Sequence, residues 1–552
     1  MQTPKYTLQL LFLLAVSCLT LSFFQTTSEK VNSSDRLSDL IEQGKVALES
    51  SHYDLALTYF NQAADSAKLY FQTDQNETTA QKYLEVQNWI GRTFNLQRNL
   101  QDALLLFNEA LDKTNPYLEE NDLEVGLNHL FQAQTYRYQR ELDKTEEQLM
   151  LAVPNLEHHQ DTLSLIWLER TFSLLAYNRY DYLTSEKHCQ KALDLIDENI
   201  EQYAFECARI YNQLGNLNTD QDNMTEGRAC YEKALQLTRQ SRTEPHLMYS
   251  IIYDNISRFH KISGSWDSMT VYANRFLESD KLIFGEEHEN VARALRFVGM
   301  GHRMQGQFKY AKEHFERALD IRLKRNGEIH YRVANLYVDL GLVNYNMENY
   351  DEALSFYQKG LDVYLKTAGD KNSNIGVCYE NIADIYEEKG EFYNALSYNL
   401  QALKLFEEIE NEQRIIEAYV NLGNTYFKFD QPLKGQNYYI KAIDRARVIF
   451  PDKNGGIARM MENLASLLLD NSMNEEGLKY AQAVINELSL EKDWLDPMES
   501  FSLDYTFSEE DVLYNALSNK ANALYALALE KKDDKLLSLS QHHYQLIYFI
   551  NY

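Results

Sequence analysis

Residues 333–366 read VANLYVDLGLVNYNMENYDEALSFYQKGLDVYLK, and this stretch decides the fold. From Ala334 to Tyr345, apolar and small residues recur at steps of three and four, which predicts a helix. Residues 347–351, Met-Glu-Asn-Tyr-Asp, break this period, and a second helical stripe runs from Glu352 to Leu361. The stretch therefore predicts two antiparallel helices joined by a short turn.

A packing code of two small residues and one large residue lies inside this stretch. Gly341 and Ala353 let the two helices approach closely, and Tyr357 fills the remaining space. Its first small residue recurs along the chain at intervals of about 42 residues, so one helix pair is repeated eleven times. Repeat four, with Ser173 and Cys189 at code positions, predicts looser packing. The eleven small residues are Gly44, Gly91, Ala133, Ser173, Gly215, Ser257, Gly299, Gly341, Ala383, Gly423 and Ala465.

In register, the series of a glycine, an alanine, an aromatic residue and a second alanine resembles the tetratricopeptide repeat over residues 37–488. The resemblance implies an all-α fold, a right-handed α-solenoid of antiparallel helix pairs. The period exceeds the usual one of that family by about eight residues, or about two helical turns. We expect each second helix to run on and the next first helix to start early.

The joints at 284–288 and 326–330 resemble those of kinesin-light-chain-type repeats. His288 and His330 lie in these joints and are expected to be turn or cap residues.

Composition and motifs exclude several classes of function. The formal net charge of −28 argues against a nucleic-acid binder, because phosphate contacts need a broad surface of Lys and Arg. The sequence has no Gly-rich phosphate loop, no nucleophile elbow and no metal-ligand spacing, so we expect no catalytic residue, no metal and no cofactor. The four cysteines beyond Cys18 are too few for a disulfide framework.

The resemblance also implies a binding surface. In such arrays the first helices line a concave wall that takes a segment of a protein or peptide. The wall positions of repeats six and seven are unusually basic and predict an acidic partner or a C-terminus, unless these side chains pair with Asp254 and Glu289. The basic residues are Arg258, Lys261, Arg293, Arg296 and Arg303. Four asparagines on the same wall are expected either to bond the backbone of the partner or to be solvated: Asn212, Asn216, Asn335 and Asn424.

The N-terminal residues 1–28 predict a signal peptide or a membrane anchor, because Lys5 precedes an apolar run. Cys18 is an alternative site of lipidation. On either reading the protein is exported and periplasmic or associated with the cell envelope, and it meets a membrane only through this segment.

The repeat pattern ends after Leu488. Residues 489–507 predict an acidic linker, and residues 508–552 predict a C-terminal helical pair. The segment from Ala516 to Ala521 resembles the one that precedes CHAT, or caspase-like, protease domains in exported repeat proteins. The two hypotheses are therefore a non-enzymatic interaction scaffold and the regulatory array of a protease system whose catalytic domain lies elsewhere.

Overall fold

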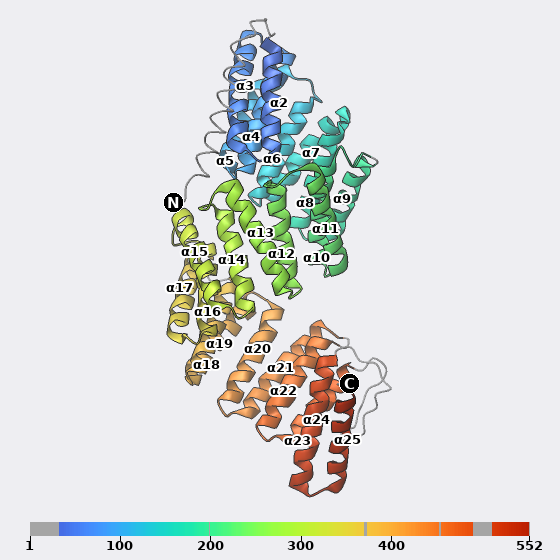
Figure 1. Cartoon of the computed structure of the whole chain (residues 1–552), viewed down its shortest axis with the longest axis vertical. Helices are drawn as coiled ribbons and strands as arrows, with labels where there is room; N and C mark the ends of the chain where they lie inside the picture. The colour runs from blue at the N-terminus through green and yellow to red at the C-terminus, as the bar shows by residue number, and fades with distance from the viewer. Residues whose placement is uncertain (1–32, 198, 369–371, 452–453, 489–509, 551–552) are drawn as a thin grey trace, which may run out of the picture. The chain divides into compact units, whose positions relative to one another are not determined.

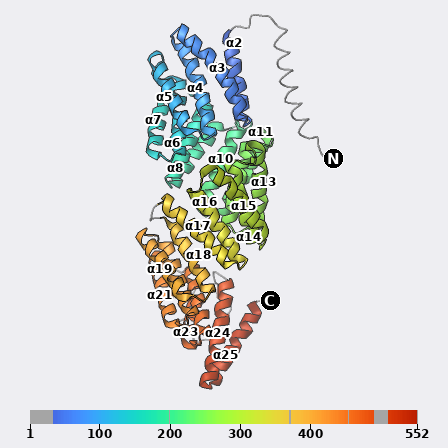
Figure 2. The same ribbon diagram turned by 90° about the vertical axis from the view of Figure 1, so that its left-hand side faces the viewer.

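The computed structural model describes residues 33–550 apart from 198, 369–371, 452–453 and 489–509. Within these residues every regular element is a helix, and successive helices form antiparallel pairs (Figures 1 and 2). The chain divides into two compact units, Met1–Glu286 and Glu287–Tyr552. Each unit is an α-solenoid of stacked helix pairs, as expected.

Six helix pairs make up the described part of the first unit, together with one short 3-10 helix, Asn115–Tyr117. The helices are α2 (Ser33–Glu49), α3 (Tyr53–Thr73), α4 (Glu77–Leu96), α5 (Leu100–Thr114), α6 (Leu123–Tyr138), α7 (Leu142–His159), α8 (Thr162–Asn178), α9 (Tyr182–Ile196), α10 (Ala204–Asp220), α11 (Met224–Ser241), α12 (Leu247–Ile262) and α13 (Trp266–Phe284).

The second unit also contains six pairs among its described residues. Its helices are α14 (Glu289–Met304), α15 (Phe308–Asn326), α16 (Tyr331–Asn346), α17 (Tyr350–Ala368), α18 (Ser373–Glu388), α19 (Phe392–Glu408), α20 (Glu412–Lys428), α21 (Pro432–Ile449), α22 (Gly455–Asp470), α23 (Asn474–Leu488), α24 (Glu510–Lys531) and α25 (Asp534–Ile550).

The packing code holds each pair together. A Cβ atom built on Gly341 would lie only 2.4 Å from Cε1 of Tyr357, so only glycine allows this approach. Gly91 stands in the same relation to Phe107, at 2.3 Å. In repeat four the ring is missing, and the buried Ser173 hydroxyl instead lies 3.1 Å from the Cys189 sulfur. Polar contacts there take the place of the aromatic filling.

The helices are longer than the code alone, as expected from the long period. The helix predicted over Ala334–Tyr345 is α16, and the second stripe lies in α17, which begins at Tyr350 and continues to Ala368. His288 and His330 are N-caps, which confirms the cap interpretation. Their Nδ1 atoms accept hydrogen bonds from the backbone N–H groups of Asn290, at 3.2 Å, and Arg332, at 3.1 Å.

First helices of successive pairs contact one another along each unit. In the first unit α2, α4, α6, α8, α10 and α12 touch in that order, and in the second unit α14, α16, α18 and α20 do the same. We call the side that these helices form the first-helix face. It is the surface on which the sequence places the candidate binding residues.

The remaining expectations concern cysteines, metals and the membrane. Cys189, Cys207, Cys230 and Cys378 are free thiols. The described residues contain no group of side chains with the spacing of a metal site and no helix long and apolar enough to cross a membrane. The predicted signal or anchor with Cys18, and the predicted linker 489–507, lie outside the described residues.

Candidate functional site

The basic residues predicted for repeat six lie on α12 in the first unit. Arg258 reaches back to repeat five, where its Nη1 lies 3.4 Å from Oδ1 of Asp220 and its Nη2 donates to Oδ1 of Asn216 at 3.2 Å. Lys261 is exposed near the end of the helix. Arg258 therefore links repeat six to repeat five through an ion pair and a hydrogen bond.

The basic residues predicted for repeat seven lie on α14 in the second unit. Arg296 forms a two-pronged ion pair with Asp339 of the next repeat, and its Nη2–Oδ1 distance is 3.2 Å. Arg303 donates to Oδ1 of Asn346 at 3.3 Å, and Arg293 is exposed. Because these residues and those of α12 belong to different units, their joint action as one basic patch stays a prediction.

The four predicted asparagines all accept hydrogen bonds from side chains of this chain. Asn212 accepts from Asn255 at 3.0 Å, and Asn216 accepts from Tyr231 at 2.8 Å as well as from Arg258. Asn335 accepts from Tyr364, and Asn424 accepts from Tyr439 at 2.6 Å. Their amide N–H groups remain the part of the side chain that could reach a partner.

A larger basic group, which the sequence reasoning missed, lies on and beside the first-helix face of the first unit. We call it the arginine cluster. Four of its members occupy the same wall offsets, six or three residues before or one or four residues after the small core residue, in repeats two to five. The cluster consists of Arg92 on α4, Arg98 after α4, Arg137 on α6, Arg170 on α8, Arg209 on α10 and Arg242 after α11.

The centre of the cluster is one buried carboxylate, Glu206, on α10. Its Oε1 accepts from the Trp167 indole at 3.0 Å and lies 3.3 Å from Nη1 of Arg209, while its Oε2 lies 4.0 Å from Nε of Arg170. The guanidinium carbon of Arg92 stacks 3.9 Å from the centroid of the Trp167 ring. Three arginines from α4, α8 and α10 are thus held around one acid.

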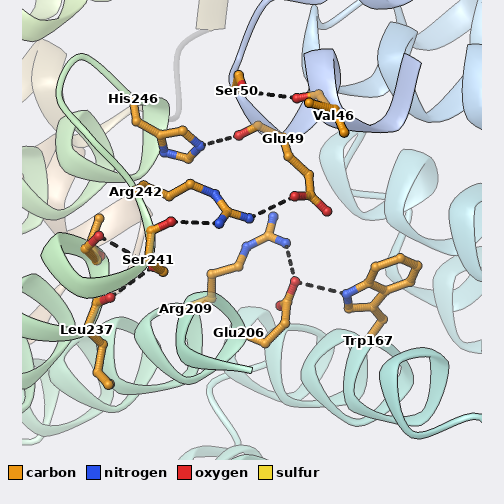
Figure 3. A network of polar contacts seen from close by, with 11 residues as sticks. Val46, Glu49, Ser50, Trp167, Glu206, Arg209, Leu237, Ser241, Arg242 and His246 are labelled. Atoms are coloured by element: carbon orange, nitrogen blue, oxygen red, sulfur yellow. Dashed lines mark hydrogen bonds and ion pairs between the residues drawn. The ribbon is translucent and has the colours of Figure 1, made fainter. Parts of the chain in front are cut away.

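A contact between distant repeats borders the cluster. Nη2 of Arg242 lies 3.0 Å from Oε2 of Glu49, at the end of α2, and Nε2 of His246 lies 2.5 Å from the backbone oxygen of Glu49. Figure 3 shows both bonds beside the Arg209–Glu206–Trp167 group. The first unit therefore curls so far that repeat one touches the joint between repeats five and six.

The titration of neighbouring groups reports a positive field in this region. Burial alone would raise the pKa of Tyr138, but the charges of Arg98, Arg137, Arg170 and Arg209 outweigh burial and lower it to about 8. Burial and the charge of Arg209 lower the pKa of Arg170 to about 9. The shift of Tyr138 reflects the positive charge of the four arginines around it, whereas that of Arg170 comes first from burial.

The first-helix face of the second unit contains a hollow with an apolar floor. A hollow of about 280 Å³ opens between α20 and α22 and is lined by Ile416, Val420 and Met460 together with polar groups such as Asn421. Nearby, burial raises the pKa of Glu380 to about 7. This hollow has room for one or two side chains and offers amide groups beside an apolar floor.

Comparison with known families decides the identity of the repeats. Three stretches, residues 208–241, 332–408 and 416–448, match models of the family described as "Tetratricopeptide repeat". The chain contains tetratricopeptide repeats. Among curated proteins no sequence match was found.

Solved structures with tetratricopeptide-like folds resemble the chain at low identity. The apo form of RapI is 13% identical, with a TM-score of 0.51, and covers 67% of this chain and 98% of its own. The apo form of the quorum sensor NprR from B. thuringiensis is 14% identical, with a TM-score of 0.51, covering 65% and 97%. Kinesin light chain TPR-like repeats from Podosopora anserina are 14% identical, with a TM-score of 0.32, covering 36% and 97%. At these identities the likeness concerns the fold alone.

Proposed function

We propose that this protein is a non-enzymatic interaction scaffold that binds a segment of a protein or peptide along its first-helix face. The observation that carries the proposal is the hollow between α20 and α22. Two of its lining residues, Glu417 and Val420, occupy wall offsets of the tetratricopeptide repeats, and the hollow combines apolar side chains with the amide groups of Gln413, Asn421 and Asn454. Such a combination suits an extended segment, because a bound side chain enters the apolar floor while its backbone bonds the rim.

The rest of the first-helix face supports this function. Contacts between neighbouring first helices, such as Arg296–Asp339 and Asn421–Glu380, hold the wall in one arrangement before any partner arrives. A preformed wall loses less side-chain entropy on binding than a flexible one. RapI and NprR share the fold with TM-scores above 0.5, and NprR is named as a quorum sensor.

Within each unit separately, basic residues would add charge selection to the first-helix face, on α12 in the first unit and on α14 in the second. Arg293 and Lys261 are the exposed members, so they are the ones that we expect an acidic partner to meet first. The partner of the predicted patch is then an acidic peptide or C-terminus. The export signal and the envelope location remain part of this hypothesis.

The test compares two valine-to-arginine variants in α20 and α21. Val420→Arg fills the hollow, whereas Val448→Arg places the same charge on a second helix where the valine is 82% exposed. We expect Val420→Arg to reduce the retention of the partner segment in a pull-down from an exported-protein fraction by at least tenfold. Equal retention by both variants would refute the proposed surface.

The alternative of a regulatory array in a CHAT protease system rests on the resemblance around Ala516–Ala521 alone. Sequencing the reading frame that follows Tyr552 distinguishes the two: a caspase-like domain there favours the protease system, and unrelated sequence favours the scaffold.

A further inference from the structure

The arginine cluster holds more positive charge than its neighbours balance. Among the described residues, the carboxylates that pair with its six arginines are Glu206 and Glu49. Arg92, Arg98 and Arg137 have no ion pair among the described residues and lie against aromatic rings instead. In a chain whose formal net charge is −28, such a concentration of unmatched guanidinium groups needs a reason.

Aromatic rings hold the guanidinium groups in place without using their N–H donors. The guanidinium carbons of Arg98 and Arg137 lie 4.0 and 4.5 Å from the ring centroid of Tyr138. Those of Arg242 and Arg209 lie 4.5 and 5.4 Å from the ring of Phe205. Stacking orients the planar groups without occupying their edges. Arg209 and Arg242 already donate from those edges to Glu206, Ser241 and Glu49, and the donors that remain can meet an anion.

Several of these donors are buried and have no acceptor. They are Nη1 of Arg92 and the Nε atoms of Arg137 and Arg242, whereas Nε of Arg170 faces Oε2 of Glu206 at 4.0 Å. A buried charged donor without an acceptor is costly, so native proteins rarely keep one without a purpose. The side chains of Arg170 and Arg209 are still 15% and 21% exposed, which leaves them a route to a ligand.

We propose that the arginine cluster binds the carboxylates of an acidic peptide segment, which supply the acceptors that Glu206 and Glu49 do not. Carboxylates match the planar edge of a guanidinium group with two parallel hydrogen bonds. The cluster draws on α4, α6, α8, α10 and the end of α11, so a ligand with several carboxylates engages more of it than one small ion can. The inference rests on the proposed function, because it names the chemistry of a segment bound on the first-helix face.

The binding experiment uses the full chain and two peptide probes. Hexaglutamate and hexaglutamine are titrated by calorimetry at low and physiological salt, and inorganic phosphate is titrated separately. We expect hexaglutamate to bind at least tenfold more tightly than hexaglutamine and to lose affinity as salt rises. If hexaglutamate binds no better than hexaglutamine, or no better than phosphate, the peptide-carboxylate site is wrong.

The double variant Arg92→Gln with Arg137→Gln is compared with Arg228→Gln, a single substitution of an arginine outside the cluster. Neither Arg92 nor Arg137 pairs with a carboxylate, so replacing them leaves no carboxylate without its ion-pair partner. Arg228 is 69% exposed on α11 and pairs with Glu232. The double variant should weaken hexaglutamate binding at least tenfold and flatten its salt dependence, while Arg228→Gln should not. Unchanged affinity in a double variant of native helicity would overturn the proposal.

A spectroscopic signal distinguishes binding at the cluster from binding elsewhere. An anion at the cluster should offset the arginine charges and raise the pKa of Tyr138 above about 8, and the difference in phenolate absorbance between wild type and Tyr138→Phe reports this. Binding without this shift would place the peptide elsewhere and overturn the inference. Loss of partner retention in Val420→Arg alongside no hexaglutamate binding would leave the proposed function standing and remove only this inference.

Discussion

The imidazole of His246 donates a hydrogen bond from Nε2 to the backbone oxygen of Glu49, 197 positions earlier in the sequence, at 2.5 Å. Its Nδ1 accepts from the backbone N–H of Met248 at 3.0 Å, so the neutral ring uses both nitrogens. Protonation of Nδ1 would remove the hydrogen bond from the backbone N–H of Met248 and place a positive charge near Arg242. The contact between His246 and Glu49, which closes the first unit, therefore depends on pH.

The first prediction concerns that connection. Burial, with the charges of Arg242 and Arg209, lowers the pKa of His246 to about 4. Below pH 6.5 the unfolded chain takes up the proton first, so this contribution to stability is complete above pH 6.5 and is lost as pH falls toward 4. By pH 5 the loss should reach about 2 kcal/mol. Urea denaturation at pH 7 and pH 5 measures it.

The control variants isolate this ring from other histidines. His246→Gln can keep the bond to Glu49 but does not titrate, so its stability should depend less on pH in this window than that of the wild type. His158→Gln makes the same substitution at an exposed histidine at the end of α7, away from the contact with Glu49, and serves as the control. A His246→Gln profile that matches the wild type would contradict the assignment.

The second prediction tests the packing code. Gly341→Ala would place a methyl group 2.4 Å from the Tyr357 ring, and we expect the free energy of unfolding to fall by about 1–3 kcal/mol. Gly360→Ala, in the partner helix, meets Val338 at 3.1 Å and should cost far less, because alanine also favours the helix. Adding Tyr357→Leu should lessen the effect of Gly341→Ala. Additive effects of these two changes in thermal denaturation would contradict the code.

Sequence reasoning could predict the helix pairs because the code is local. Gly341, Ala353 and Tyr357 lie within one repeat, and their spacing alone fixes which faces meet. The start of α17 at Tyr350 rather than at Glu352 was not predictable from the apolar stripe, because the first turn of a helix has few apolar contacts.

The arginine cluster escaped prediction for a different reason. Repeats two to five carry only one arginine each at the wall offsets, whereas repeat seven carries three, so a count by repeat favoured repeat seven. Only the curvature that brings Glu49 to His246 gathers Arg92 and Arg209 around shared neighbours. Curvature accumulates from small rotations between repeats, which no single repeat encodes.

The third prediction concerns the basic residues on α14. Arg293→Glu with Arg303→Glu should weaken the capture of an acidic partner several-fold and reduce its dependence on salt. Arg296 is best left intact, because a glutamate there would lie against the buried Asp339 and destabilise the wall. Lys309→Glu with Lys312→Glu on α15 matches the charge change away from that face. Fluorescence anisotropy with a labelled acidic peptide measures the affinity of each double variant. Equal losses of affinity in both would show that the effect comes from net charge alone and would contradict a site on α14.

The central claim is that partners bind on the first-helix face. Photo-crosslinking measures this most directly, with a benzophenone amino acid placed at Val420 on α20 or at Val448 on α21, followed by mass spectrometry of the captured segment. We expect crosslinks to one defined partner segment from position 420 and none from position 448. Crosslinks from position 448 without any from position 420 would contradict it.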